Sequence, residues 1–152
     1  MSKSTIKGLD KVYKDFAKLS QEVHKKVGIV TKANAMEISA DAKKNARKDF
    51  GKLSQGISYE KVDDTFNYKI FAREKYSAFV EFGTGGMVKV PNELKEIAIQ
   101  FKGKGVKEVN LPARPFLYPA FVKGRVRFLD DLNDLLNKET KKIWLNNFLI
   151  LG

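Results

Sequence analysis

Hydrophobic residues recur at helical spacing along the first fifty positions of the chain. Leu9, Phe16 and Val23 are seven residues apart, and beyond Gly28 the apolar positions follow at intervals of four, three and four. The second stripe consists of Ile29, Ala33, Met36 and Ala40. Stripes of this period predict an amphipathic helix. The change at Gly28 predicts either two helices or one long helix bent there, with Gly51 as the C′ residue after its end.

Alternating apolar and polar residues follow this helical segment. Phe66, Tyr68 and Ile70 alternate with polar neighbours, which is typical of a half-buried strand. Asp63-Asp64-Thr65 has the composition of a turn. We therefore expect an antiparallel hairpin over residues 55–73. The apolar run at 76–82 predicts a third strand, which ends in a mobile loop at Gly83-Thr84-Gly85-Gly86.

Prolines organise the second half of the chain. Pro91 predicts the start of a short helix, and an extended segment over 106–111 follows it. The buried face of this short helix is expected to contain Leu94, Ile97, Ala98 and Phe101. Because proline is tolerated in the first turn of a helix, the last helix should begin near Leu117 to Pro119. Its expected buried stripe is Val122, Val126, Leu129, Leu132, Leu136 and Ile143. The apolar end, 144–151, should pack back on the sheet or dock on a neighbour.

The order of these elements predicts one α+β domain over residues 1–152. In it, the long N-terminal helix and the C-terminal helix pack on a small antiparallel sheet. We find no internal repeat, low-complexity segment or domain boundary.

The composition argues against catalysis. Hydrophobic residues make up 43% of the 152 residues, too many for a disordered polycation. The chain has no Cys and one His, which excludes thiolate metal sites and leaves little for acid–base chemistry. His24 lies among charged residues and is expected on a solvated helix face, and the pairs Asp63-Asp64 and Asp130-Asp131 are weak candidates for a hydrolase. We therefore expect no catalytic residue, cofactor, metal or membrane span.

The charge is strongly positive and uneven. The formal net charge is +11, of which residues 1–52 contribute +7. Such a surface would attract nucleic acid, an acidic protein ring or a membrane surface, although lysines on helix faces often serve only solubility. A basic nucleic-acid-binding module is accordingly the alternative function. No recognised base-reading motif accompanies the charge.

Two residue clusters carry the most specific information. The first is Tyr76-Ser77-Ala78-Phe79-Val80-Glu81-Phe82-Gly83-Thr84, and the second is Pro112-Ala113-Arg114-Pro115-Phe116-Leu117-Tyr118-Pro119-Ala120. Glu81 has apolar neighbours, so its carboxylate should be at least partly buried and should need a partner. We hypothesise an ion pair between Glu81 and Arg114. Alternatively, both clusters only shape the fold, with Gly83 at positive φ.

These clusters resemble the head–tail joining family of long-tailed bacteriophages and prophages, also called neck or tail-component proteins. The family is typified by the gene-product-ten protein of an HK-type lambdoid phage. Gly51-Lys52-Leu53-Ser54-Gln55-Gly56-Ile57 is similar to the family's Gly-x-Leu-x-x-Ser-Ile entry into its first strand, with Gly56 where Ser is common. The resemblance covers residues 8–130. Its motif residues are Tyr76, Glu81, Phe82, Gly83, Thr84, Arg114, Pro115, Phe116 and Pro119.

The resemblance implies a structural virion protein of the head–tail junction, a neck or tail-completion component without enzymatic activity or cofactor. Its partners would be other connector and tail proteins, and its copies would form a hexameric ring close to the packaged DNA. The expected locations are the virion and, during assembly, the host cytoplasm. The candidates for contacts between subunits are Gly85, Gly86, Trp144, Phe148 and Leu149.

Overall fold

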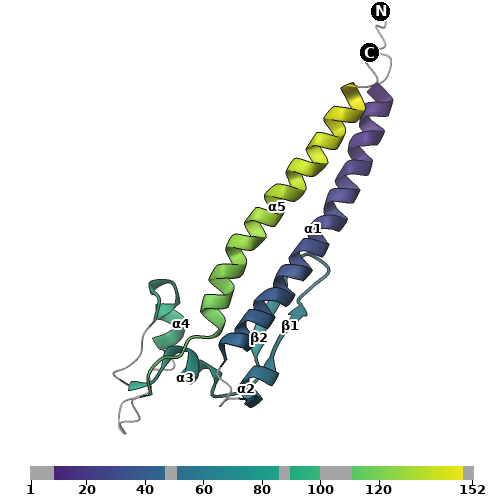
Figure 1. The fold of residues 1–152 in the computed structure, drawn as a ribbon. Coiled ribbons are helices and arrows are strands. Elements are labelled where there is room, and N and C mark those ends of the chain that lie inside the picture. Colours follow the sequence, from purple (N-terminus) through teal and green to yellow (C-terminus); the bar gives the residue numbers. More distant parts are fainter. Residues whose placement is uncertain (1–8, 47–50, 86–89, 100–110, 149–152) are drawn as a thin grey trace, which may run out of the picture.

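The computed structural model describes residues 9–46, 51–85, 90–99 and 111–148. Two long antiparallel helices, α1 (Leu9–Asn45) and α5 (Leu117–Phe148), form an elongated pair, and the short elements gather at one end of it (Figure 1). The short elements are α2 (Gly51–Gly56), β1 (Ile57–Lys61), β2 (Tyr68–Ala72), α3 (Ser77–Phe82), the 3-10 turn η3 (Asn92–Leu94) and α4 (Lys95–Ile99). The predicted α+β class is confirmed.

Helix α1 continues through Gly28 without a break, so the alternative of two helices is wrong. A Cβ atom at Gly28 would lie 3.0 Å from Cε1 of Phe66, so the glycine lets this aromatic ring approach the helix closely. The helix ends at Asn45, before the expected position. Gly51 begins α2, so its predicted role as the C′ residue of the long helix is also wrong.

The hairpin is confirmed. Strands β1 and β2 pair antiparallel with Ile57 opposite Ala72. In the connection, the carboxylate of Asp63 accepts hydrogen bonds from the backbone N–H of Thr65 at 2.8 Å and the side-chain amide of Asn67 at 3.1 Å. The Asp63 side chain therefore pairs with polar groups of its own turn, as is typical of Asp in turns.

The predicted third strand is a helix, α3. Periodicity alone cannot distinguish a short apolar strand from a buried helical turn. In the helix, the backbone N–H of Val80 donates to the carbonyl of Tyr76 at 3.1 Å, and both side chains pack against the core. The extended segment predicted over 106–111 lies outside the described residues except for Leu111, which is in neither helix nor strand.

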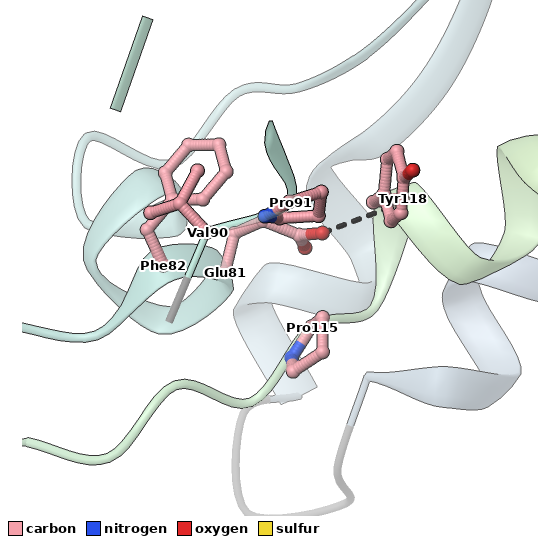
Figure 2. A pocket seen from close by; sticks show the side chains of 6 residues that line it. All are labelled: Glu81, Phe82, Val90, Pro91, Pro115 and Tyr118. Carbon is pink, nitrogen blue, oxygen red and sulfur yellow. Dashed lines mark hydrogen bonds between the residues drawn. The ribbon is translucent and has the colours of Figure 1, made fainter. Parts of the chain in front are cut away.

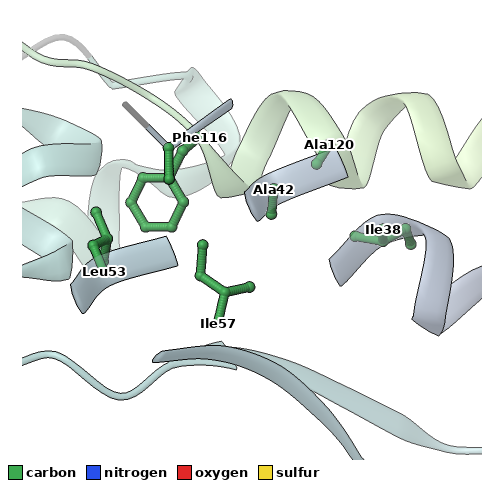
Figure 3. Close-up of a cluster of buried hydrophobic side chains, with 7 residues drawn as sticks. Ile38, Ala42, Leu53, Ile57, Phe116 and Ala120 are labelled. Atoms are coloured by element: carbon green, nitrogen blue, oxygen red, sulfur yellow. The ribbon is translucent and has the colours of Figure 1, made fainter. Parts of the chain in front are cut away.

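The core lies where the two long helices meet the hairpin and α2 (Figure 3). Its buried members are Ile38, Ala42, Ala46, Leu53, Ile57, Phe116 and Ala120. Farther along the helix pair, a Cβ atom at Gly124 would lie 2.1 Å from Cγ1 of Ile38. The two helices therefore approach each other through small residues, and no larger side chain fits between them there.

The predicted buried stripe of α5 is largely wrong, and the second apolar stripe of α1 is exposed as well. On α5, Val122, Val126, Leu129 and Leu136 are exposed, and on α1 the same is true of Ile29, Ala33, Met36 and Ala40. Only Leu132 of the predicted α5 stripe is half-buried, and the side chain of Ile143 lies outside the described residues. The cause is the close approach of the helices, which buries Ala120 and Gly124 and turns the larger apolar residues outward.

The short helix is predicted in part. Pro91 precedes η3, as expected, and Ala98 is buried with 2% of its surface exposed. Leu94 is half-buried, whereas Ile97 is 50% exposed, contrary to prediction. Phe101 lies outside the described residues.

Candidate functional site

Glu81 is buried at the point where α3 meets the beginning of α5, and only 7% of it is exposed. Its Oε2 accepts hydrogen bonds from the backbone N–H groups of Phe116 at 2.8 Å and Leu117 at 2.9 Å. Its Oε1 accepts a third from the N–H of Tyr118 at 2.8 Å (Figure 2). The predicted burial of Glu81 is thus confirmed, and its carboxylate caps the N-terminus of α5 from a distant part of the chain.

The hypothesised ion pair between Glu81 and Arg114 is wrong. The backbone N–H groups of α5 satisfy the Glu81 carboxylate, and Arg114 is exposed. Instead, Arg114 contributes its backbone, whose N–H donates to the carbonyl of Val80 at 2.8 Å. The sequence pointed to a cation as the partner because it does not reveal where free N–H groups of a helix end will lie.

Gly83 and Thr84 complete the link between the two motifs. Gly83 has φ of 78° and ψ of −174°, as expected for a glycine, and its N–H donates to the carbonyl of Phe79 at 2.9 Å. The N–H of Thr84 donates to the carbonyl of Leu111 at 2.9 Å, and the N–H of Leu111 donates back to Oγ1 of Thr84 at 2.9 Å. The two sequence motifs therefore form one structural unit.

The other motif residues surround this unit in different ways. Phe116 is a core residue, and Pro119 lies in the first turn of α5. A cavity of about 340 Å³ is lined by Glu81, Phe82, Val90, Pro91, Pro115 and Tyr118 (Figure 2). At its edge, the hydroxyl of Tyr118 donates to Glu93 at 3.3 Å. Partial desolvation and the nearby Glu93 carboxylate raise the pKa of Tyr118.

A second cluster of polar residues joins the two long helices and has no counterpart among the sequence predictions. Arg127 of α5 donates from Nη1 to Oδ2 of Asp41 on α1 at 3.0 Å, which lowers the pKa of Asp41. Farther along, Nζ of Lys26 donates to Oε1 of Glu139 at 2.7 Å, which lowers the pKa of Glu139 and raises that of Lys26. Matched charges on two separate helical stripes are not recognisable before the pairing of the helices is known.

A buried amide reinforces the close approach of these helices. The side-chain N–H₂ of Asn34 donates to the carbonyl of Gly124 at 2.8 Å, and Asn34 is only 8% exposed. Because Gly124 lacks a side chain, its carbonyl is accessible to a residue of the neighbouring helix.

The predicted contact candidates are only partly described. Trp144 is 72% exposed and Leu145 is also exposed, so this part of α5 does not pack back on the sheet. Gly85 has φ of 60°, whereas Gly86, Leu149 and the side chain of Phe148 lie outside the described residues.

Within the described ranges, no cluster of three or more His, Cys, Asp or Glu residues could hold a metal ion. No described helix is long and apolar enough to span a membrane. His24 is exposed, as expected, and the centroid of its ring lies 4.6 Å from the centroid of the Phe66 ring.

None of the curated proteins and none of the solved structures matches the chain significantly. A family model described as "Bacteriophage HK97-gp10, putative tail-component" matches residues 10–83. The matched segment contains nearly all of α1, the hairpin and Glu81 to Gly83, and it ends before the second motif. Residues 10–83 of this chain are therefore similar to the HK97-gp10-like family of putative bacteriophage tail components, as the resemblance of its first motif predicted.

Proposed function

We propose that this protein is a structural component of the head–tail junction of a long-tailed phage or prophage. In this proposal it acts in the neck or in tail completion, between the capsid connector and the tail tube, and performs no catalysis. It would occur in the host cytoplasm during assembly and then in the virion. The family match supports a phage tail component, and the surface of the helix pair supports assembly through contacts between copies.

The observation that carries this proposal is the pair of uncovered apolar stripes on α1 and α5. Ile29 is 68% exposed on α1, and Val126 is 58% exposed on α5. Soluble monomers rarely expose large contiguous apolar patches without a partner for them. Since successive helical residues are about 100° apart, the α5 stripe lies opposite the side on which Ala120 and Gly124 face α1. The stripes therefore offer two different surfaces for neighbours.

The two stripes also lie at the same height along the helix pair. Lys26 contacts Glu139, and Gly124 lies against Ile38, so residues 29–40 of α1 are level with the α5 stripe. A rotation about an axis parallel to the helices would place the α1 stripe of one copy beside the α5 stripe of the next. Contacts between unlike surfaces close into rings when the rotation closes, which supports the ring of the proposal; the hexamer itself is carried over from the resemblance.

Charge substitutions within the stripes test this role in an infectious phage that depends on the protein. Leu129→Glu on α5 and Met36→Glu on α1 should each leave the monomer folded by circular dichroism, because both side chains are exposed. Electron micrographs of lysates should then show full heads and separate tails. The matched control is Asn137→Glu, at an exposed polar position of α5. Normal yields of infectious virions from both stripe variants would overturn the proposal.

The alternative function, a basic nucleic-acid-binding module, is favoured by one observation. Lys18, Lys25 and Lys32 are exposed at intervals of seven along α1, and within the described residues none of them forms an ion pair. Their spacing along the helix axis is about 10.5 Å. A gel shift of random duplex DNA that weakens with salt and with Lys→Gln changes at these positions would support it. If the protein does not bind DNA even at low salt, the nucleic-acid-binding function is ruled out. The proposed proximity to packaged DNA is then ruled out as well.

A further inference from the structure

We propose that Arg114 and the apolar cavity beside it form a docking site for a partner protein. The segment that it binds would carry a carboxylate next to an aromatic or aliphatic side chain. This deepens the proposed assembly role, on which it rests, by naming the chemistry of one contact.

The backbone of Arg114 is fixed, whereas its side chain is exposed. Its N–H donates to the carbonyl of Val80 at 2.8 Å, and Pro115 follows it directly. The guanidinium forms no hydrogen bond or ion pair within the described part of the chain. Glu81, the carboxylate that the sequence suggested as a partner of Arg114, instead accepts hydrogen bonds from the first backbone N–H groups of α5. The structure thus fixes the backbone from which this guanidinium extends, and no group of the described residues pairs with the guanidinium.

A cavity of about 200 Å³ is lined in part by Arg114. Its lining residues are Tyr76, Phe79, Val80, Leu111, Pro112 and Arg114. The walls are aromatic and aliphatic, and the only charged group among these lining residues is that of Arg114. Cavities of about 150 Å³ with apolar walls bind a benzene ring, so this one has room for one large apolar side chain.

The combination of one cation and apolar walls defines the partner chemistry. Arg pairs with a carboxylate through two parallel hydrogen bonds, and the apolar cavity favours a side chain next to that carboxylate. Nucleic acid fits less well, since affinity for its backbone comes from neutralising many phosphates and this site offers one charge. The occupant that fits is therefore an acidic, apolar protein segment.

Two small probes test this site on the full chain. N-acetyl-phenylalanine carries an aromatic ring and a carboxylate, and N-acetyl-phenylalaninamide has the same ring without the charge. In ¹⁵N-edited NMR titrations, the carboxylate probe should shift the backbone amides of Val80, Leu111 and Arg114. The amide probe should bind about tenfold more weakly because it lacks the charge-assisted pair.

Matched variants test whether the preference for the carboxylate probe depends on the guanidinium of Arg114. Arg114→Met should abolish the difference between the probes, and Arg114→Lys should retain part of it because an ammonium cannot form the two parallel bonds. Arg125→Met, at an exposed arginine of α5, is the control and should leave the difference unchanged.

Equal affinity for both probes, a preference that survives Arg114→Met, or shifts confined to other regions would overturn the docking site. Such results would leave the head–tail role untouched, because the stripe variants test that role separately. Conversely, the probes could bind as expected while phages with the stripe variants remain infectious. That combination would overturn the proposed place in the virion and leave the docking site standing.

Discussion

The carboxylate of Glu81 accepts a hydrogen bond from the backbone N–H of Phe116 at 2.8 Å, although the two residues are 35 positions apart in the chain. Leu117 and Tyr118 donate to the same carboxylate, and the next residue, Pro119, has no N–H to donate. The N–H groups at the start of α5, which an isolated helix would leave without partners, are therefore accounted for. A negative charge at this end also stabilises the helix dipole.

Removing the Glu81 carboxylate should destabilise the fold severely. Glu81→Ala leaves one buried and two partly buried N–H groups without their acceptor and should lower the free energy of unfolding by about 3 kcal/mol. Glu81→Gln keeps one acceptor oxygen and should cost less. Urea unfolding followed by circular dichroism measures both values. Glu96→Ala, at an exposed carboxylate, is the control, and equal stability of Glu81→Ala and this control would contradict the capping role.

The contact between Gly124 and Ile38 should not tolerate a methyl group. Alanine favours helices over glycine by about 1 kcal/mol, yet Gly124→Ala would place Cβ 2.1 Å from Cγ1 of Ile38 and push the helices apart. We expect a net loss of about 1–3 kcal/mol in the free energy of unfolding.

Two comparisons check the cause of that loss. Gly51→Ala has no atom within 4 Å of the added Cβ and should be neutral or slightly stabilising. In the double variant with Ile38→Ala, the clash is removed, so the combined loss should be smaller than the sum of the single losses. Strict additivity would show that the clash is not the cause.

Stability should fall at acid pH because of the ion pairs between the long helices. The hydrogen bond from Arg127 holds the pKa of Asp41 below its usual value, and Lys26 does the same for Glu139. A carboxyl group whose pKa is lowered by folding stabilises the folded state above its ordinary pKa of about 4. That contribution is lost as the pH falls through the lowered pKa.

Urea midpoints measured from neutral pH to acid pH test this dependence. Asp41→Asn removes one of the carboxyl groups whose pKa is lowered, so its midpoint should decrease less on acidification than that of the parent. Asp130→Asn, at an exposed residue without an ion pair in the described part of the chain, should retain the full decrease. Parallel curves for the parent and Asp41→Asn would contradict the role of this pair.

Arg114→Met should leave folding intact. The residue contributes its backbone N–H to Val80, and that bond survives the substitution. We expect the free energy of unfolding to change by less than about 0.5 kcal/mol, as at other exposed positions. A large loss of stability would instead support the hypothesis of an ion pair between Arg114 and Glu81 that the sequence suggested. This measurement therefore separates an internal role of Arg114 from an intermolecular one.

Local sequence patterns predicted most of the elements. The period of the apolar residues predicted the long helices, the alternation before Ala72 predicted the hairpin, and the prolines predicted the start of α5 at Leu117. The apolar neighbours of Glu81 predicted its burial. These properties depend on residues close together in the chain, such as backbone preferences and the proximity of apolar side chains.

Only the tertiary structure decided which faces are buried and which groups meet. Both long helices bury small residues such as Ala42 and Gly124, because that face allows the closest approach, and they leave Ile29 and Leu129 exposed. Hydrophobic periodicity measures how apolar a face is, but it does not measure how closely two backbones can approach. Likewise, the partner of Glu81 is a set of main-chain N–H groups whose position exists only after α3 and α5 have packed together.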